Sequence, residues 1–98
     1  MLTISLEKLV GSFAENKDIA QTIRKEMIVP ELHKHERVTL DFMHVDSATQ
    51  SFIHALISDL FREFGSDVLD NILFKNCSES VKKIIGIVVE YMQQGDID

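Results

Sequence analysis

Hydrophobic and polar residues alternate at the start of the chain, and two short apolar runs follow later. Single polar residues separate Leu2, Ile4 and Leu6, which is the period-two pattern of a strand that buries one face. Residues 38–43 begin with a β-branched side chain, and residues 71–75 form another short apolar run; both are typical of strands. The pattern therefore predicts three strands.

Between the first two strands, hydrophobic residues recur at helical spacing. Residues 12–15 have the spacing of a capping box, with Asn16 as an alternative N-cap, and the apolar stripe follows over 19–28. This pattern predicts an amphipathic helix that ends before Pro30. The polar stretch 31–37 is then expected to turn over the surface.

Two further helices are predicted. Over residues 52–64 the hydrophobic side chains recur at i, i+3, i+4, i+7 and i+8, and Ser47, Thr49 and Ser51 are all acceptable N-caps. Gly65 marks the end of this helix.

The last helix follows the third strand. Asn76 and Glu79 offer its cap, and its apolar stripe runs over 81–92. The tail, 93–98, is expected to fray.

Strands and helices thus alternate in the order β-α-β-α-β-α. Helical crossovers of this length join parallel strands by right-handed connections, so we expect an α/β sandwich with a small, mostly parallel sheet in one domain over residues 1–98. Three strands are few, and the sheet could recruit the Val10 region or a partner chain at an edge. The strand order stays open.

Length and composition indicate a packed globular domain. Of the 98 residues, 45% are hydrophobic and 27% charged, unlike the composition of disordered or fibrous chains. A domain of this size buries only roughly 60 to 65% of the surface that its unfolded chain exposes. Little material is left to enclose a deep active site, which argues against a stand-alone enzyme.

Charge and cysteine content indicate the cellular compartment and exclude some classes of partner. The net charge is −6 and no more than two basic residues are adjacent, so the electrostatic attraction to nucleic acid is missing. Cys77 is the one cysteine and cannot form an internal disulfide, which suits a reducing compartment. No stretch approaches a signal peptide or the roughly 20 apolar residues of a membrane span. We expect a cytoplasmic protein that binds neither nucleic acid nor membrane.

Catalytic and cofactor motifs are absent from the sequence. It contains no Walker A motif and no GxGxxG, CxxC, HExxH or GxSxG pattern. His33 and His35 could supply two zinc ligands, but a site needs a further donor, and a charged surface loop is the favoured interpretation. We therefore predict no catalytic residue, no cofactor and no metal site.

Two histidines lie close to hydroxyl side chains in the chain. His44 or His54 could act as a base for Ser47 or Ser51. No orienting partner accompanies either histidine in the sequence, so a surface position is the favoured interpretation.

Asp41 and Cys77 each lie beside the end of a predicted strand. Parallel sheets present functional loops where Asp41 lies, although its side chain could instead point off the edge of the sheet. Helix amides could lower the pKa of the Cys77 thiol, but a small buried apolar filler is the favoured interpretation.

Small hydroxylated side chains are densest over residues 46–52, between the second strand and the second helix. The amides and macrodipole of a helix N-terminus favour a phosphate, so a phosphorylated Ser or Thr could be accommodated and recognised there. Ordinary capping needs the same residue types and is the favoured explanation on the residues alone.

Four short segments occur in a familiar order. They are the V-x-L-D-F strand at 38–42, the Ser-Phe helix start within 49–56, the Phe-Gly helix end at 64–65 and the late strand that ends in Asn within 72–78. The Gly-Ser turn at 11–12 and the helix around 20–24 are similar as well. Together these segments resemble the STAS-like family, small bacterial domains of uncharacterised function.

That family is similar in turn to the STAS domain of anti-sigma-factor antagonists, which are non-enzymatic switches. In those proteins a serine kinase of the histidine-kinase-like ATPase fold phosphorylates a Ser at the start of the helix after the second long strand, and the phosphate disrupts binding. The resemblance places Gln50 at the phosphoacceptor position, Ser51 directly after it, and Phe52 where the antagonists carry glycine. It implies a STAS-like sandwich and a histidine-kinase-like ATPase as partner.

The leading hypothesis is a non-enzymatic regulatory protein-interaction module. Its partner or kinase would recognise Ser47, Thr49, Gln50 and Ser51, and Ser51 is the leading phosphoacceptor candidate.

Two alternatives belong to other classes. A small-ligand or nucleotide-binding domain would use the loops at the C-terminal ends of the strands, with the ligand residues Gly11, Ser12, Asn76 and Ser78. A structural subunit or inhibitor would pair through a strand edge or a helix face, for example as a homodimer.

Overall fold

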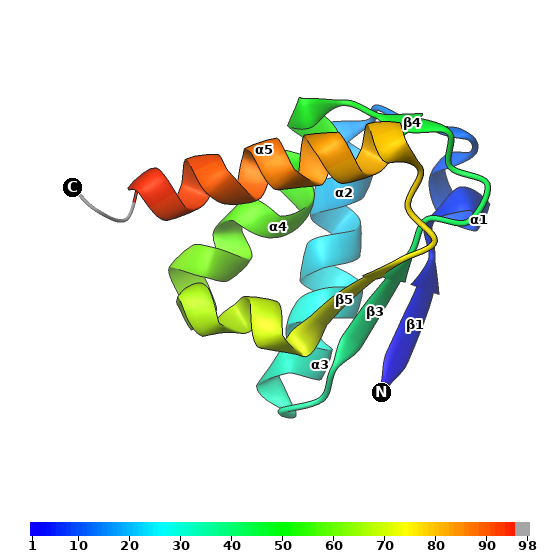
Figure 1. The fold of residues 1–98 in the computed structure, drawn as a ribbon. Helices are drawn as coiled ribbons and strands as arrows, with labels where there is room; N and C mark the ends of the chain where they lie inside the picture. The colour runs from blue at the N-terminus through cyan, green and yellow to red at the C-terminus, as the bar shows by residue number, and fades with distance from the viewer. Residues whose placement is uncertain (96–98) are drawn as a thin grey trace.

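Three parallel strands form the main sheet of the computed structural model, which describes residues 1–95. They are β1 (Leu2–Ser5), β3 (Val38–Asp41) and β5 (Ile72–Lys75), and their spatial order is β1-β3-β5 (Figure 1). The three predicted strands, their parallel pairing and the α/β fold class are confirmed. Each strand is slightly shorter than its predicted range.

Helices cover one face of this sheet. Ile4 and Leu40 occupy adjacent register positions and are buried, whereas Thr3 and Leu73 on the opposite face are exposed. Figure 1 shows the long helices to one side of the strands. The pleat therefore separates a core face from a more open face, on which Thr39 of the central strand is still buried.

A second, two-stranded parallel sheet was not predicted. After α1 (Leu6–Val10), β2 (Phe13–Ala14) pairs with β4 (Ser47–Ala48). The capping box predicted over 12–15 is wrong, because Phe13 and Ala14 form β2 and the helix begins only at Lys17. The Val10 region is helical and adds no strand to the main sheet; the alternative cap is correct, since the Asn16 side chain accepts from the amides of residues 18 and 19 at 2.9 and 3.2 Å.

The first long helix does not end before Pro30. α2 (Lys17–Ile23) continues as the π-helix η1 (Arg24–Ile28) and then as α3 (Val29–His33). Pro30 lies in the first turn of α3, where a missing N–H is tolerated. The π-helical turn thus lets the helix pass the proline, and only the later part of the stretch 31–37 turns over the surface.

The remaining helices follow the predicted pattern with corrected ends. α4 (Gln50–Phe64) starts from Thr49 and ends at Gly65, whose φ is +84°, and an unpredicted 3-10 helix, η2 (Ser66–Asn71), leads to β5. α5 (Glu79–Gly95) is capped by the Ser78 hydroxyl, which accepts from the Val81 amide at 3.2 Å, and not by Asn76. Of the tail that is expected to fray, residues 93–95 belong to α5, and 96–98 lie outside the described residues.

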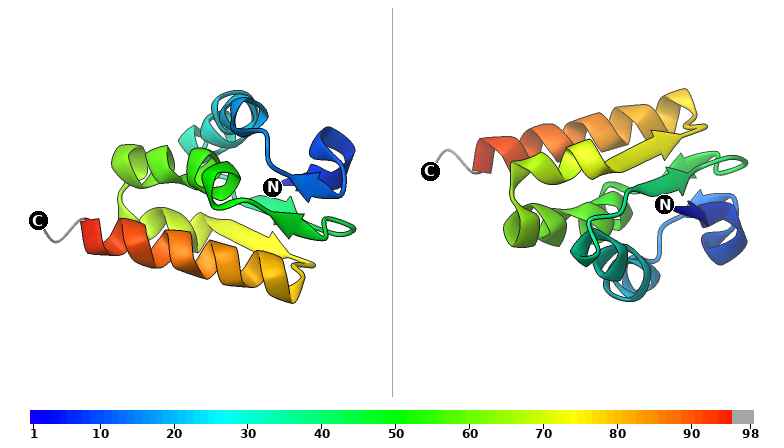
Figure 2. Two further views of the ribbon diagram at one scale, coloured as in Figure 1. Left: turned by 90° about the horizontal axis from the view of Figure 1, so that it is seen from above. Right: turned by 90° about the horizontal axis from the view of Figure 1, so that it is seen from below.

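α4 is the central helix of the molecule. It packs against α2 and against α5, which Figure 2 shows on its two sides. Its inward side chains join those of the sheet in one core, whose largest fully buried members include Phe42, Phe52, Leu56, Ile57 and Leu60. None of the described helices has the length and hydrophobicity needed to span a bilayer.

Candidate functional site

The N-terminus of α4 separates the four predicted site residues into two pairs. Thr49 and Ser47 are half-buried and hold the backbone: the Thr49 Oγ1 accepts from the Phe52 amide at 3.1 Å, and Ser47 pairs with β2. Gln50 and Ser51, in the first turn, are exposed. Capping is thus the task of Thr49, which leaves Gln50 and Ser51 facing outward.

Gln50 and Ser51 line a groove of about 620 Å³ along α4. His54, for which the sequence favours a surface position over a role as a base, is exposed and lines the same groove, one turn further along the helix. α2 contributes Lys17 to one wall, and α5 contributes Tyr91 to the other, with 65% of its surface exposed. The groove therefore joins three helices that are distant in sequence; we call it the α4 groove.

A buried arginine supports the α4 groove. Arg24, the first residue of η1, is only 6% exposed; its guanidinium donates to the carbonyl oxygen of Ala55 and lies 3.1 Å from an Asp59 carboxylate oxygen. Arg62, also on α4, lies 3.6 Å from the other Asp59 oxygen. The buried charge of Arg24 is tolerated because the Ala55 carbonyl and the Asp59 carboxylate both pair with the guanidinium.

The groove is locally basic on an acidic protein. Its lining carries three cationic side chains, Lys17, Arg24 and Arg62, and one carboxylate, Asp59, whereas the chain as a whole has a net charge of −6. Sequence reasoning missed these residues. The one signal in the sequence concerned Arg24, which directly follows Ile23, a residue of the predicted apolar stripe.

Comparison with known proteins identifies the family. A family model described as "STAS-like domain of unknown function (DUF4325)" matches residues 19–82. The chain belongs to this family. No curated protein and no solved structure matches it.

The match covers part of the groove, and leaves out Lys17, Val88 and Tyr91. Residues 19–82 include nearly all of α2, the whole of α4 and the start of α5. The resemblance seen in the sequence is therefore confirmed at the level of family and fold, and the role of the groove is a separate question.

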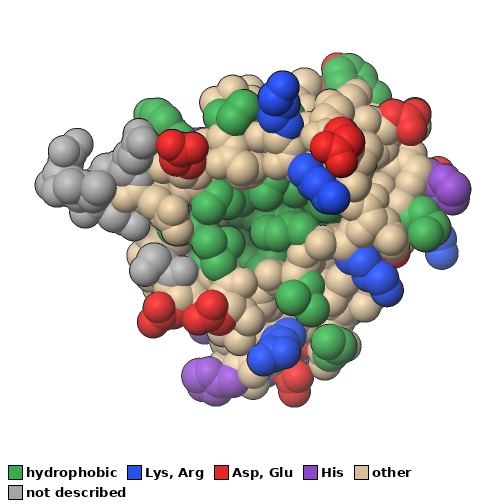
Figure 3. All heavy atoms as spheres, in the orientation of Figure 1, with side chains coloured by type: hydrophobic (Ala, Val, Ile, Leu, Met, Phe, Trp, Pro, Cys, Tyr) green, Lys and Arg blue, Asp and Glu red, His purple; other side chains and the backbone are tan. Residues whose placement is uncertain are grey.

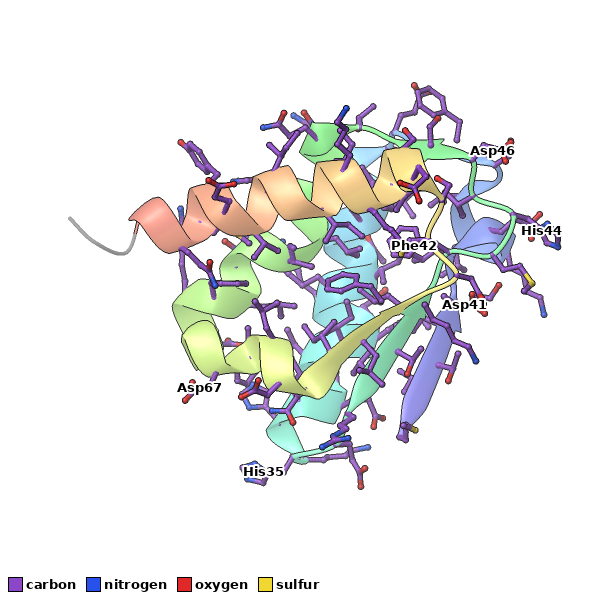
Figure 4. The ribbon with its side chains drawn as sticks, viewed as in Figure 1. His35, Asp41, Phe42, His44, Asp46 and Asp67 are labelled. Atoms are coloured by element: carbon purple, nitrogen blue, oxygen red, sulfur yellow. The ribbon has the colours of Figure 1, made fainter. Side chains whose placement is uncertain are left out.

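At the C-terminal ends of the strands, the STAS-like domain joins its loops by hydrogen bonds. The Asp41 Oδ1 accepts from the Met43 amide and from the Asn76 side chain, both at 3.0 Å. These bonds, the Asn76 bond first, hold the pKa of the Asp41 carboxyl below its usual range. Asp41 ends the central strand, so it does not point off a sheet edge (Figure 4).

The other predicted ligand loops are tied together in the same way. The Ser12 carbonyl accepts from the Asp46 amide at 2.8 Å, and the Ser78 hydroxyl donates to the Asp46 carbonyl at 3.0 Å while capping α5. Gly11, at φ +79°, ends α1. These contacts hold the segment that leads into α4, and so position Gln50.

The remaining candidates lie apart from the groove. Cys77 is half-buried in apolar surroundings, and burial raises the pKa of its thiol instead of lowering it. His33 stacks on Phe64 with 5.1 Å between ring centroids, and His35 and His44 are exposed with positive φ. Within the described residues no three metal-ligating side chains gather.

Proposed function

We propose that this STAS-like domain is a non-enzymatic regulatory module that binds a protein partner through the α4 groove. The observation that carries the proposal is the grouping of exposed Gln50 and Ser51 with Lys17 and Arg62 in one groove. A surface of this kind recognises another chain by charge and by hydrogen bonding.

The chemistry of the groove favours an acidic partner segment with an apolar anchor. Its cations attract carboxylates that the rest of the domain, at a net charge of −6, repels. Tyr91 offers a large exposed aromatic surface beside Val88 on the α5 wall, and tyrosine is a frequent energetic centre of protein interfaces. Electrostatics would then direct the partner and Tyr91 would retain it.

Phosphorylation of Ser51 would close the same site. Ser51 is exposed in the first turn of α4, where free amides and the macrodipole stabilise a phosphate. A phosphate there would add negative charge to the end of the groove that Lys17, Gln50 and Ser51 line, and would repel an acidic partner segment. The resemblance to anti-sigma-factor antagonists suggests the enzyme, a histidine-kinase-like ATPase, which would be both partner and kinase.

Binding to such an ATPase from the same host tests the proposal. Isothermal titration of wild type, Ser51→Asp and Ser80→Asp compares two serines that are both exposed and both the second residue of a helix. We expect Ser51→Asp to weaken binding at least about tenfold and Ser80→Asp to leave it unchanged. Equal affinities for all three proteins would rule out the groove as the regulated surface.

A second measurement locates the phosphate. After incubation with the ATPase and ATP, mass spectrometry should find one phosphate on Ser51 and none in Ser51→Ala. Modification of Thr49 would contradict the proposal, since the Thr49 hydroxyl caps α4 and is half-buried.

A further inference from the structure

A second hollow, lined by apolar side chains, opens between α5 and β5 (Figure 3). Its volume is about 580 Å³, and its lining includes Leu69, Ile72, Phe74, Ile85 and Val89. Figure 1 shows α5 and β5 diverging across this face, because α5 packs on α4 and on the β4 segment. The edge of β5 therefore borders an apolar hollow.

The backbone of β5 offers hydrogen-bonding groups on that side. β5 is an edge of the main sheet among the described residues, and its Lys75 carbonyl accepts from the Phe42 amide at 2.8 Å on the β3 side. Backbone groups alternate between the two sides of a strand, so the N–H and C=O of Phe74 point to the open edge. Such an edge beside apolar surface is a template for another strand.

The charges at the two ends of β5 indicate which chain supplies the added strand. Asp67 and Asp70 precede the strand, whereas Lys75 and Lys82 lie at its other end, and Lys82 lines the hollow. A two-fold contact joins the same patch on both copies and runs their β5 strands antiparallel. Lys75 and Lys82 of each copy then lie toward Asp67 and Asp70 of the other, whereas the carboxylate of Asp41 lies on the far side of Lys75, on β3.

We propose that two copies of this chain associate through the β5 edge, so that their main sheets continue across a two-fold axis. The backbone groups of Phe74 pair across the axis. Leu73, which is 44% exposed on the open face of the sheet, is buried against the second copy, and the apolar hollow is covered. This contact is independent of the partner proposed for the α4 groove.

Mass measurement with matched variants tests the contact. The molecular mass of the wild type, measured by light scattering, should rise with protein concentration from 11.2 kDa toward twice that value. Leu73→Glu should raise the dimer dissociation constant at least about tenfold. Leu9→Glu is the control, because Leu9 is also 44% exposed but lies on α1, after the opposite edge strand. A wild type that stays monomeric at about 0.5 mM overturns the proposal.

Charge reversal tests the antiparallel arrangement. Asp70→Lys and Lys82→Glu should each weaken the dimer, and the double variant should restore it, because opposite charges then face each other again. Circular dichroism melting of each variant at a concentration where it is monomeric checks that the fold is retained. A double variant as weak as the worse single one rules out this arrangement.

Amide exchange gives a readout that needs no substitution. The Phe74 amide should become protected as concentration rises, whereas the Leu73 amide, directed toward β3, should be protected throughout. A dimer whose Phe74 amide exchanges equally fast at low and high concentration would use another surface, and the proposal would be overturned.

Discussion

Arg24 carries a charge where the core meets the α4 groove. Its guanidinium bonds to the Ala55 carbonyl and pairs with Asp59 at once, so η1 and α4 are joined by a polar contact at the edge of the core. Burial of a charge costs several kcal/mol, and loss of its partners leaves that cost unmatched. We interpret Arg24 as the residue that fixes the floor of the groove.

Arg24→Ala should lower the free energy of unfolding by about 2 to 3 kcal/mol, from lost packing of the arginine and loss of its bonds. Asp59→Asn should cost less, about 1 kcal/mol, because Asp59 is half exposed and Arg24 keeps its bond to Ala55. Urea unfolding of both variants measures the difference. Equal losses would show that the ion pair, and not the buried arginine, carries the stability.

Asp41 links the stability of the domain to acid pH. Its bonds to Asn76 and Met43 lower its pKa in the folded state, below the roughly 3.9 of an unfolded chain. The stabilisation is therefore present above about pH 4 and is lost as the pH falls through the folded pKa. The wild type should lose more stability between about pH 5 and pH 2 than Asp41→Asn does.

Urea unfolding across that pH range measures this difference. Asn76→Gly is a second variant, since glycine accepts the φ of +58° at position 76 but lacks the donating amide. It should flatten the pH dependence in part, and less than Asp41→Asn does, because the Met43 amide still bonds to the Asp41 carboxylate. Parallel curves for all three proteins would show that the carboxylate is not linked to folding.

At the scale of elements, the start of α4 places a structural residue, Thr49, close to Ser51, the residue proposed for recognition. Thr49→Ala removes the side chain that caps α4 and should cost about 1 kcal/mol of stability. Ser51→Ala changes an exposed side chain and should stay within about 0.5 kcal/mol. Thermal and urea unfolding measure both effects.

Ser51→Ala and a further variant, Thr49→Ser, separate effects on folding from effects on binding. Ser51→Ala should remove phosphorylation with stability unchanged, and Thr49→Ser, which retains the hydroxyl, should keep the cap. A large loss of stability in Ser51→Ala would contradict the assignment of capping to Thr49 and of recognition to Ser51.

The elements with strong local patterns could be predicted from the sequence. The strands at 2–6, 38–43 and 71–75 and the helix at 52–64 each carry their periodicity within a few residues. β2 could not be predicted, because two residues have no periodicity and their strand conformation comes from pairing with β4. The helix past Pro30 was missed because a proline within a helical pattern normally ends the helix, whereas here the π-helical turn precedes it and Pro30 falls in the first turn of α3.

The candidate site was predictable to the same degree. The hydroxyl-rich segment before α4 was recognised because capping and phosphate binding both depend on local residue types. Lys17, Arg24 and Tyr91 could not be assigned to it, because three helices distant in sequence bring them together. Which hydroxyl caps and which faces outward also depended on the fold, since Ser47, Thr49 and Ser51 are all acceptable caps.

At the scale of the whole molecule, α5 divides the surface into two regions. Its Val88 and Tyr91 line the α4 groove, whereas its Ile85 and Val89 line the hollow beside β5. One helix thus forms a wall of both sites, yet different side chains face each. Partner binding and association of two copies can therefore occur on the same molecule.

This division predicts that the dimer presents two α4 grooves and binds two partner chains. Sedimentation of the mixture should give a 2:2 assembly for the wild type and a 1:1 complex for Leu73→Glu, with the same affinity per groove. Ser51→Asp should do the opposite, with the dimer retained and the partner lost. If Leu73→Glu also lost the partner, or Ser51→Asp also lost the dimer, the two surfaces would be coupled through α5. Coupling of that kind would make association of two copies a step in the regulation instead of a fixed scaffold.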